Sequence, residues 1–228
     1  FLNRRDKQFQ LDFTKFAVPN IKNMVSVVLP VYNGDDMIEE SIKSVLIQTY
    51  KNFELIIVDD GSTDKTPRIV DKWAKRDRRI RVIHQANAKL PRALNRGFSC
   101  AKGEFLTWTS ADNRMHKDFL EKLVDYMKRN PKIAMCYANL RAIDVNGDPL
   151  RNNGWYPREE NNGNVYLPNA VLRLNTYPEN TVAAAFMYRR AIPKLLGGYD
   201  PNLYTVEDYD YWMRINDFCG LHHTDFED

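Results

Sequence analysis

The sequence predicts an α/β fold, an αβα sandwich in which helices cover both faces of a mostly parallel central sheet. Two observations indicate it. Short β-branched runs such as MVSVVLPV at 24–31 alternate with segments whose apolar side chains recur at helical spacing, and the alternation continues to residue 138. Strand, helix and strand in that order are typical of right-handed βαβ crossovers, which build parallel sheets.

The elements follow in order along the chain. Buried strands are predicted from apolar runs, at 24–31, 53–58, 80–83, 104–108, 133–138 and 181–188. Helices are predicted from 3.6-residue periodicity, at 36–46, from after Asp64 to about 76, at 90–101, 117–128, 190–196 and 206–217. Pro30 should mark the end of the first strand, because proline cannot donate to a ladder. Ser62 and Asp64 should cap the second helix.

Two segments fall outside this rhythm. Residues 1–23 are predicted to be an N-terminal extension that packs on a single domain at 24–228, which we expect to be incomplete at its C-terminus. Residues 146–164 are rich in Gly, Asn and Pro without any period. Such a segment is typical of a functional loop or lid in an α/β enzyme.

Composition narrows the function classes. The 33 basic and 30 acidic side chains give a net charge of only +3, which argues against a dedicated nucleic-acid binder. Three widely spaced cysteines favour reduced thiols and a cytoplasmic compartment. No apolar run approaches the roughly 20 residues that span a bilayer. Peripheral association with the inner face of a membrane is expected through regions outside this chain.

Polar clusters stand where three predicted strands end. Pro30, Tyr32 and Asn33 follow the first strand, residues 59–62 (DDGS) the second, and residues 110–113 (SADN) the fourth. In open parallel sheets, ligands bind beyond the carboxyl ends of the strands. The three clusters should therefore converge on one crevice.

Each acidic position has two interpretations, a role in chemistry and a purely structural role. Asp60 could accept a hydrogen bond from a base or a ribose, or it could cap the following helix. Asp112 is a candidate ligand for a Mg²⁺ or Mn²⁺ ion, and that ion would neutralise the charge of a diphosphate. Alternatively, Asp112 is a structural turn residue. One of the pair Glu207 and Asp208 would remove a proton from an acceptor hydroxyl, or both would simply complement a helix dipole. The readings remain open at this point.

Basic and histidine side chains add weaker candidates. Lys89 or Arg92 could pair with a phosphate, although solvated surface charge explains both equally well. The doublet of His222 and His223 after the last predicted helix could supply a further metal ligand. A surface doublet without any ligand role is the simpler explanation.

Six motifs in order carry a resemblance. They are PVYNG at 30–34, VDDGSTD at 58–64, KGEF at 102–105, SADN at 110–113, GGYD at 197–200 and EDYDYW at 207–212. In this order the chain resembles family 2 glycosyltransferases over about residues 24–220. The resemblance implies the GT-A fold, the nucleotide-diphospho-sugar transferase type of αβα sandwich.

The resemblance also implies roles for individual residues. Pro30 and Tyr32 would line the nucleotide pocket, and Asp60 would bind the base. We assign the neighbouring site positions Asn33, Arg92 and Ala111 to nucleotide binding as well.

The same resemblance implies an inverting transfer. Asp112 would hold the Mn²⁺ or Mg²⁺ between protein and diphosphate, Asp208 would be the catalytic base, and Glu207 would help to position it. The expected substrates are a nucleoside-diphosphate sugar, with a UDP-sugar favoured, and a glycan or lipid-linked acceptor. The product would serve cell-surface polysaccharide or glycoconjugate synthesis.

The chain departs from the family pattern at Ser110 and Asn113, where acidic residues are usual, so metal binding should depend on the donor's phosphates. The QxxRW element of processive relatives is absent, which favours addition of single sugars. A non-catalytic nucleotide-sugar-binding domain is the main alternative. A glycoside hydrolase would not need the nucleotide edge, and a nucleotidyltransferase would show a Gly- and basic-rich loop where this chain has YNGDD.

Overall fold

The computed structural model describes residues 11–15, 19–150, 164–167, 182, 184–224 and 226. Its centre is a seven-stranded sheet with the order β3-β2-β1-β4-β8-β5-β9, and a separate pair joins β6 to β7. The sheet strands are β1 (Ile21–Val31), β2 (Phe53–Asp59), β3 (Ile80–His84), β4 (Gly103–Trp108), β5 (Met135–Ala138), β8 (Phe186–Arg189) and β9 (His222–Thr224). The two-stranded pair is β6 (Leu140–Arg141) and β7 (Asn164–Val165).

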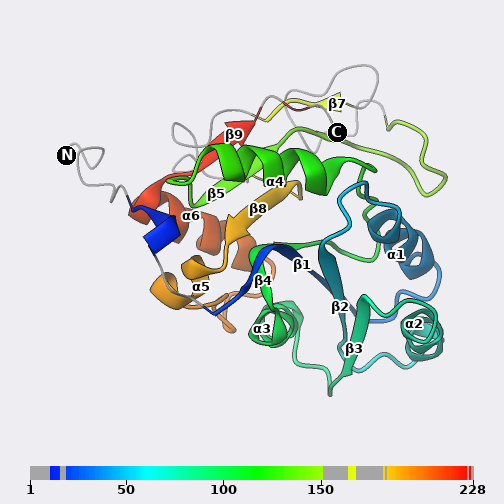
Figure 1. Cartoon of the computed structure of the whole chain (residues 1–228). Coiled ribbons are helices and arrows are strands. Elements are labelled where there is room, and N and C mark those ends of the chain that lie inside the picture. Colours follow the sequence, from blue (N-terminus) through cyan, green and yellow to red (C-terminus); the bar gives the residue numbers. More distant parts are fainter. Residues whose placement is uncertain are drawn as a thin grey trace.

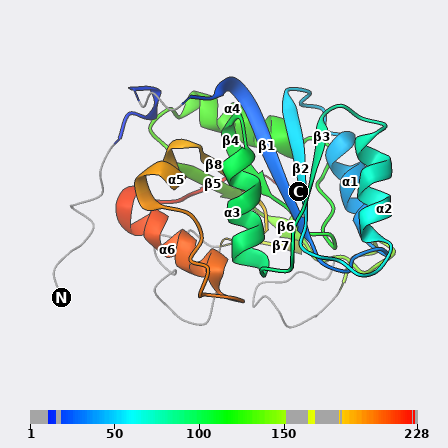
Figure 2. The same ribbon diagram turned by 90° about the horizontal axis from the view of Figure 1, so that it is seen from below.

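Helices cover both faces of the sheet (Figures 1 and 2). They are α1 (Ile38–Leu46), α2 (Thr66–Ala74), α3 (Leu90–Cys100), α4 (Phe119–Arg129), α5 (Ala191–Leu196) and α6 (Glu207–Cys219), preceded by a 3₁₀ turn at Phe13–Lys15. Apolar side chains of α1, α2 and α4 form one core with one sheet face. Those of α3, α5 and α6 form a second core on the other face. The predicted sandwich is confirmed.

The sheet is parallel except at one strand. β1 pairs in parallel with β2 and β4, and β2 pairs in parallel with β3. β8 runs antiparallel to both β4 and β5, between which it lies. The predicted mostly parallel sheet is therefore confirmed, with β8 as its one antiparallel strand among those described.

Several boundaries differ from the sequence prediction for physical reasons. β1 starts at Ile21 and continues through Pro30 to Val31, with Pro30 opposite Val58 of β2. The predicted strand at 181–188 is described as strand only from Phe186. The doublet of histidines lies inside β9, and Asn164 lies in β7 rather than in a loop. These short pairings depend on distant partners, which local periodicity does not reveal.

Part of the N-terminal extension contacts the domain. Phe13 is buried at 6% exposure and belongs to the α3 side core. The Arg189 guanidinium lies between the rings of Phe13 and Phe105, 5.8 and 5.4 Å from their centroids. Buried Arg189 also donates to the carbonyls of Met127 and Ile133. The division of the chain at residue 23 stays a prediction.

Candidate active site

The loops after β1 and β2 are joined by polar side chains. The Asn33 N–H donates to Ser62 Oγ at 3.0 Å, and the Thr63 N–H donates to Asn33 Oδ1 at 2.8 Å. The Asp35 N–H donates to Asp64 Oδ2, and the Gly34 N–H to Thr66 Oγ1. Neither predicted residue is the N-cap of α2, which is Lys65 and forms no side-chain cap bond. Asp64 accepts from the Thr66 N–H just before the helix, and Ser62 Oγ accepts from the neighbouring loop.

Asp60 organises a third segment, residues 85–89. Its carboxylate is 4% exposed and accepts from Gln85 Nε2 at 2.7 Å and from the Ala88 and Lys89 N–H groups at 2.9 Å each. Its own N–H donates to the Val31 carbonyl at 2.8 Å. The described contacts therefore show Asp60 holding the start of α3 against the end of β1. The base-binding role assigned to it stays a prediction.

Two glycines allow close approach at this edge. A Cβ on Gly34 would lie 2.9 Å from Val31 Cγ2 and 3.3 Å from the Ala111 Cβ. Gly61 has a φ of +79°, and a Cβ there would lie 2.7 Å from the Asn87 N. The first loop thus meets the loop after β4, and the second loop meets the start of α3, as convergence at one edge requires.

The loop after β4 forms a tight turn around Asp112. The Asn113 N–H donates to the Ser110 carbonyl at 3.2 Å, and Ser110 Oγ donates to Asp112 Oδ1. Buried Ser41 of α1 donates to the same Ser110 carbonyl at 2.9 Å, which anchors the turn. Asp112 itself is exposed. Its carboxylate therefore faces solvent from a fixed backbone.

A link runs from this turn to the start of α6. Trp108, the last residue of β4, donates from Nε1 to the Tyr199 hydroxyl at 3.0 Å. The ring centroids of Tyr199 and of Tyr211 in α6 lie 4.5 Å apart. Burial raises the pKa of Tyr199 well above its ordinary value, and the Asp208 charge adds a small part. Tyr199 therefore packs on α6 at Tyr211, which follows Asp208 by about one helical turn.

Arg92 and Asn95 of α3 attach to the segment that leads into α6. Arg92 Nη1 donates to the Pro201 carbonyl at 3.2 Å. Asn95 exchanges hydrogen bonds with the backbone of Tyr199, at 2.7 and 2.9 Å. The described contact of Arg92 is thus with the protein, and its assignment to a phosphate stays a prediction.

The two acidic residues at the start of α6 differ in exposure. Glu207 is 4% exposed, and within the described part of the chain its Oε2 has no hydrogen-bond partner. Burial raises the pKa of Glu207. Asp208 is half-buried, and its Oδ1 accepts from the Tyr209 N–H at 2.6 Å. Of the pair, Asp208 is the carboxylate that can meet a substrate from solvent.

Comparison with known proteins decides the family. The model of glycosyl transferase family 2 matches residues 26–196. The chain belongs to glycosyl transferase family 2. It is 30% identical over 210 residues to an uncharacterized glycosyltransferase of Rickettsia conorii, an alignment covering 87% of this chain and 32% of that protein.

Solved structures agree on the fold. Staphylococcus aureus TarS 1-349 in complex with UDP-GlcNAc has a TM-score of 0.68 at 22% identity, covering 88% of this chain and 56% of that one. The Pyrobaculum calidifontis mannosyltransferase PcManGT in complex with GDP-Man and Mn²⁺ has a TM-score of 0.65 at 21% identity, covering 88% and 54%. The GT-A fold is confirmed. The chain spans between about a third and just over half of the length of these three proteins.

Most of the site residues predicted from the family resemblance lie on loops that contact one another. Contacts unite the loops that carry Asn33, Asp60, Ala111 and Asp112. Trp108 and Tyr199 connect the end of β4 to Tyr211 of α6, the helix that also carries Asp208. Tyr32 lies beside them at 53% exposure. The lid predicted at 146–164 falls largely at 151–163, outside the described residues.

Sequence reasoning missed two positioning residues. Gln85 binds the Asp60 carboxylate, and Tyr199 joins β4 to α6. Tyr199 lay in the GGYD motif and could have been proposed. No pattern in the sequence pointed to Gln85.

The residues at the edge fit a divalent cation only in part. Within the described ranges no three His, Cys, Asp or Glu side chains form a metal-binding group. Asp112 offers one exposed carboxylate, with the oxygen-bearing side chains of Ser110 and Asn113 in the same turn. Mg²⁺ and Mn²⁺ accept such oxygen sites when substrate phosphates supply the remaining ligands. His223 is engaged otherwise, at 2.8 Å from Asn139 Oδ1.

Proposed function

We propose that this chain is the transferase domain of an inverting glycosyltransferase. It would move a sugar from a nucleoside-diphosphate donor to an acceptor hydroxyl. The observation that carries the proposal is the physical connection between the Asp112 turn and the start of α6 through Trp108 and Tyr199. This connection supports a common site for a candidate cation ligand, Asp112, and a candidate base, Asp208.

The donor would bind along the edge formed by the loops after β1, β2 and β4. Asp60 fixes the start of α3 there, and Tyr32 offers an exposed ring beside it. Two proteins with a similar fold are solved in complex with nucleotide sugars, TarS with UDP-GlcNAc and PcManGT with GDP-Man. We favour a UDP-sugar for this chain.

Asp208 would act as the general base. It accepts the proton of the acceptor hydroxyl while the oxygen attacks the anomeric carbon opposite the departing nucleoside diphosphate, so one displacement inverts the configuration. A general base contributes about 10²- to 10⁴-fold in such steps. Asp112 would hold a Mn²⁺ or Mg²⁺ ion, and a bound ion of this kind neutralises charge on the leaving diphosphate.

The acceptor would be a glycan or a lipid-linked sugar on the cytoplasmic side, for polysaccharide or glycoconjugate synthesis. Within the described residues, no helix has the length and apolar character to cross a bilayer. A non-catalytic nucleotide-sugar-binding domain is the second candidate. Ser110 favours it, because its hydroxyl occupies one oxygen of Asp112.

Thermal unfolding with UDP, GDP and dTDP, each with and without Mn²⁺, tests donor binding. A nucleotide that binds only the folded state at a hundred times its Kd stabilises it by about 2.7 kcal/mol. We expect the largest shift with UDP and Mn²⁺. Asp112→Ala should lose the Mn²⁺-dependent part of that shift and keep the metal-independent part. The absence of any shift with all three nucleotides would overturn the proposal.

A donor panel then separates the two candidates. Release of nucleoside diphosphate in the presence of acceptors supports the transferase. Binding with no release from any donor supports the non-catalytic domain.

A further inference from the structure

Positive charge is concentrated in one short segment that the proposed transfer does not use. Residues 65–81 contain eight Lys or Arg and only two Asp, a net charge of +6, whereas the whole chain carries +3. The remainder of the chain is therefore net negative. The segment comprises α2 and the turn into β3, at the outer end of the sheet (Figures 1 and 2).

Most of these cations have no ionic partner. Lys65, Arg68, Lys72, Lys75, Arg76 and Arg78 are exposed, and in the described part of the chain none forms an ion pair. We call these six residues the α2 cationic face. The two acids nearby are engaged, since Asp71 Oδ1 lies 3.1 Å from His84 Nε2 and Asp77 lies 2.7 Å from Arg79 Nη2.

On other helices, cationic side chains form ion pairs with acidic residues four positions away. On α4, Lys122 pairs with Asp118 at 3.2 Å, and Arg129 pairs with Asp125 at 2.9 Å. On α6, Arg214 pairs with Asp210 at 2.7 Å. Such i,i+4 pairs are the usual arrangement on a solvated helix. The α2 cationic face lacks them, although like charges at this spacing destabilise a helix.

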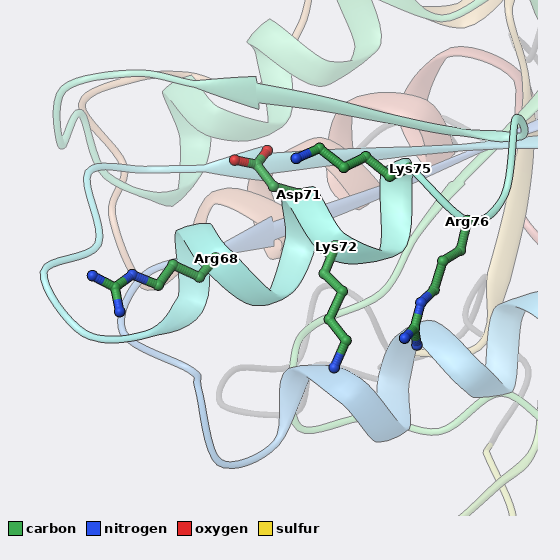
Figure 3. Close-up of a pocket in the computed structure, with 5 residues that line it drawn as sticks. All are labelled: Arg68, Asp71, Lys72, Lys75 and Arg76. Atoms are coloured by element: carbon green, nitrogen blue, oxygen red, sulfur yellow. The ribbon is translucent and has the colours of Figure 1, made fainter.

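The cationic groups spread rather than converge. Figure 3 shows Lys72 and Arg76 extending to one side of α2, Lys75 to the other, and Arg68 near its start. Arg68, Asp71, Lys72, Lys75 and Arg76 line only a shallow hollow. A single phosphate would meet few of these groups at once. An extended anionic plane would meet most of them.

An exposed apolar side chain follows α1, near the turn that ends the cationic segment. Ile47 is 62% exposed just after α1. Arg79 Nη2 donates to the carbonyl of the preceding Leu46, which places Ile47 beside the turn that ends the segment. Trp73, the aromatic residue of α2, is half-buried and donates from Nε1 to Glu39 Oε1 at 3.2 Å. It is not available as a stacking platform for nucleic-acid bases, which single-stranded binding requires.

We propose that the α2 cationic face docks the domain on an anionic lipid surface. Lys or Arg near such a surface contributes about 1 kcal/mol each, within a screening length of roughly 8 Å at physiological salt. Ile47 would enter the headgroup boundary. α2 begins directly after the loop that binds residues 33–35, so a membrane along α2 lies beside the donor edge. The proposal does not depend on the proposed function.

Sedimentation with vesicles tests the docking, without any donor present. The probes are phosphatidylcholine vesicles and vesicles of equal parts phosphatidylcholine and phosphatidylglycerol. We expect binding only to the mixed vesicles, and weaker binding as salt rises. The quadruple variant with Arg68, Lys72, Lys75 and Arg76 changed to Gln should bind several hundredfold more weakly, at about fivefold for each lost cation.

The matched control removes the same number of exposed cations around α4. Lys117, Lys128, Arg129 and Lys132 are each changed to Gln, and this variant should bind mixed vesicles within about twofold of the wild type, because these residues lie outside the docking face. Circular dichroism checks that both variants fold.

Failure of the wild type to bind mixed vesicles, or equal losses in the two variants, would overturn the proposal. So would binding to an oligonucleotide but not to vesicles. None of these results bears on donor binding.

Discussion

The two sides of the candidate site are held together by different forces. On the donor side, loops after β1 and β2 and the start of α3 are joined by hydrogen bonds from short polar side chains to backbone, with Asp60 at the centre. On the α6 side, rings pack on rings: Trp212 lies 4.5 Å from Phe186, and Tyr199 lies 4.5 Å from Tyr211.

The difference extends to buried polar atoms. Asp60 is buried and satisfied. On α6, Glu207 Oε2, Tyr211 Oη and Trp212 Nε1 are buried without a hydrogen-bond partner in the described ranges. Unsatisfied buried groups are costly, by about 1–3 kcal/mol each. In the described ranges, the donor side is therefore held by satisfied hydrogen bonds, and the α6 side mainly by ring packing.

Asp208→Asn should have the largest effect, on the chemical step alone. Loss of the base is expected to lower the transfer rate by about 10²- to 10⁴-fold. The Kd for UDP should stay within about twofold, because the donor edge does not use this carboxylate. Single-turnover kinetics and calorimetry measure the two quantities.

Asp210→Asn is the matched control for that variant. Asp210 lies two residues further along α6 and pairs with Arg214. It should keep nearly full activity. Transfer by the Asp208 variant at the rate of the Asp210 variant would show that the base lies elsewhere.

Trp212→Ala should have the largest effect on folding. The side chain is fully buried against Phe186, Tyr188 and Tyr211. Truncation of such a core residue costs about 3–5 kcal/mol. Urea unfolding should show the loss, whereas UDP affinity of the folded protein should change little. A large fall in UDP affinity would mean that the ring packing on α6 also sets the shape of the donor edge.

Asp60→Ala should lower both stability and UDP affinity. Removal of the carboxylate leaves the Ala88 and Lys89 N–H groups and the Gln85 amide without their acceptor. We expect a loss of about 2–3 kcal/mol in stability, together with a clear fall in UDP affinity. The control is Asp125→Ala on α4, an exposed residue whose ion pair with Arg129 is worth well under about 1 kcal/mol. Unchanged UDP affinity in the Asp60 variant would remove this loop junction from donor binding.

The same contrast explains how far the sequence could predict the molecule. Strands and helices from β1 to α4 have strong local periodicity, so their bounds are predicted within a few residues. β8 and β9 are set by partners far along the chain, and the short polar run that forms β9 has no strand signature. At the site, residue types predicted Asp60, Asp112 and Asp208. The link through Tyr199 and the contact from Gln85 arise only when distant segments meet.

Glu207→Gln should give a smaller, pH-dependent gain on the α6 side. Burial raises the pKa of Glu207, so the folded state favours the protonated form and stability falls as pH rises through the folded pKa. Gln removes that loss, and the variant should be more stable near neutral pH by about 1 kcal/mol. The advantage should vanish as pH falls below the ordinary pKa of glutamate. Thermal melts across pH 4 to 8 measure it.

Glu40→Gln provides a control of opposite sign. The hydrogen bond from Lys43 lowers the pKa of Glu40, so its contribution is present above the ordinary pKa and is lost as pH falls. The Glu40 variant should therefore be slightly less stable at neutral pH, with the difference closing in acid. The same trend in both variants would contradict the assigned burial of Glu207.

Lys89→Gly tests whether the donor side carries strain of its own. Lys89 has φ 73° and ψ 161°, a backbone region that is essentially restricted to glycine and costs other residues about 1–3 kcal/mol. Because glycine also loses more entropy on folding, the expected net gain is only about 1 kcal/mol in urea unfolding. Lys89→Ala keeps the strain and should show no gain.

The two variants at position 89 also separate backbone from charge. Both remove the ammonium group, and both keep the N–H that binds Asp60. If the Lys89 side chain pairs with the donor diphosphate, both variants lose UDP affinity by the same factor, and the loss shrinks as salt screens the pair. If the loop geometry alone matters, only the glycine variant changes UDP affinity. Equal stability of the glycine and alanine variants would show that this backbone conformation is not strained, and the donor edge would then hold its shape without cost.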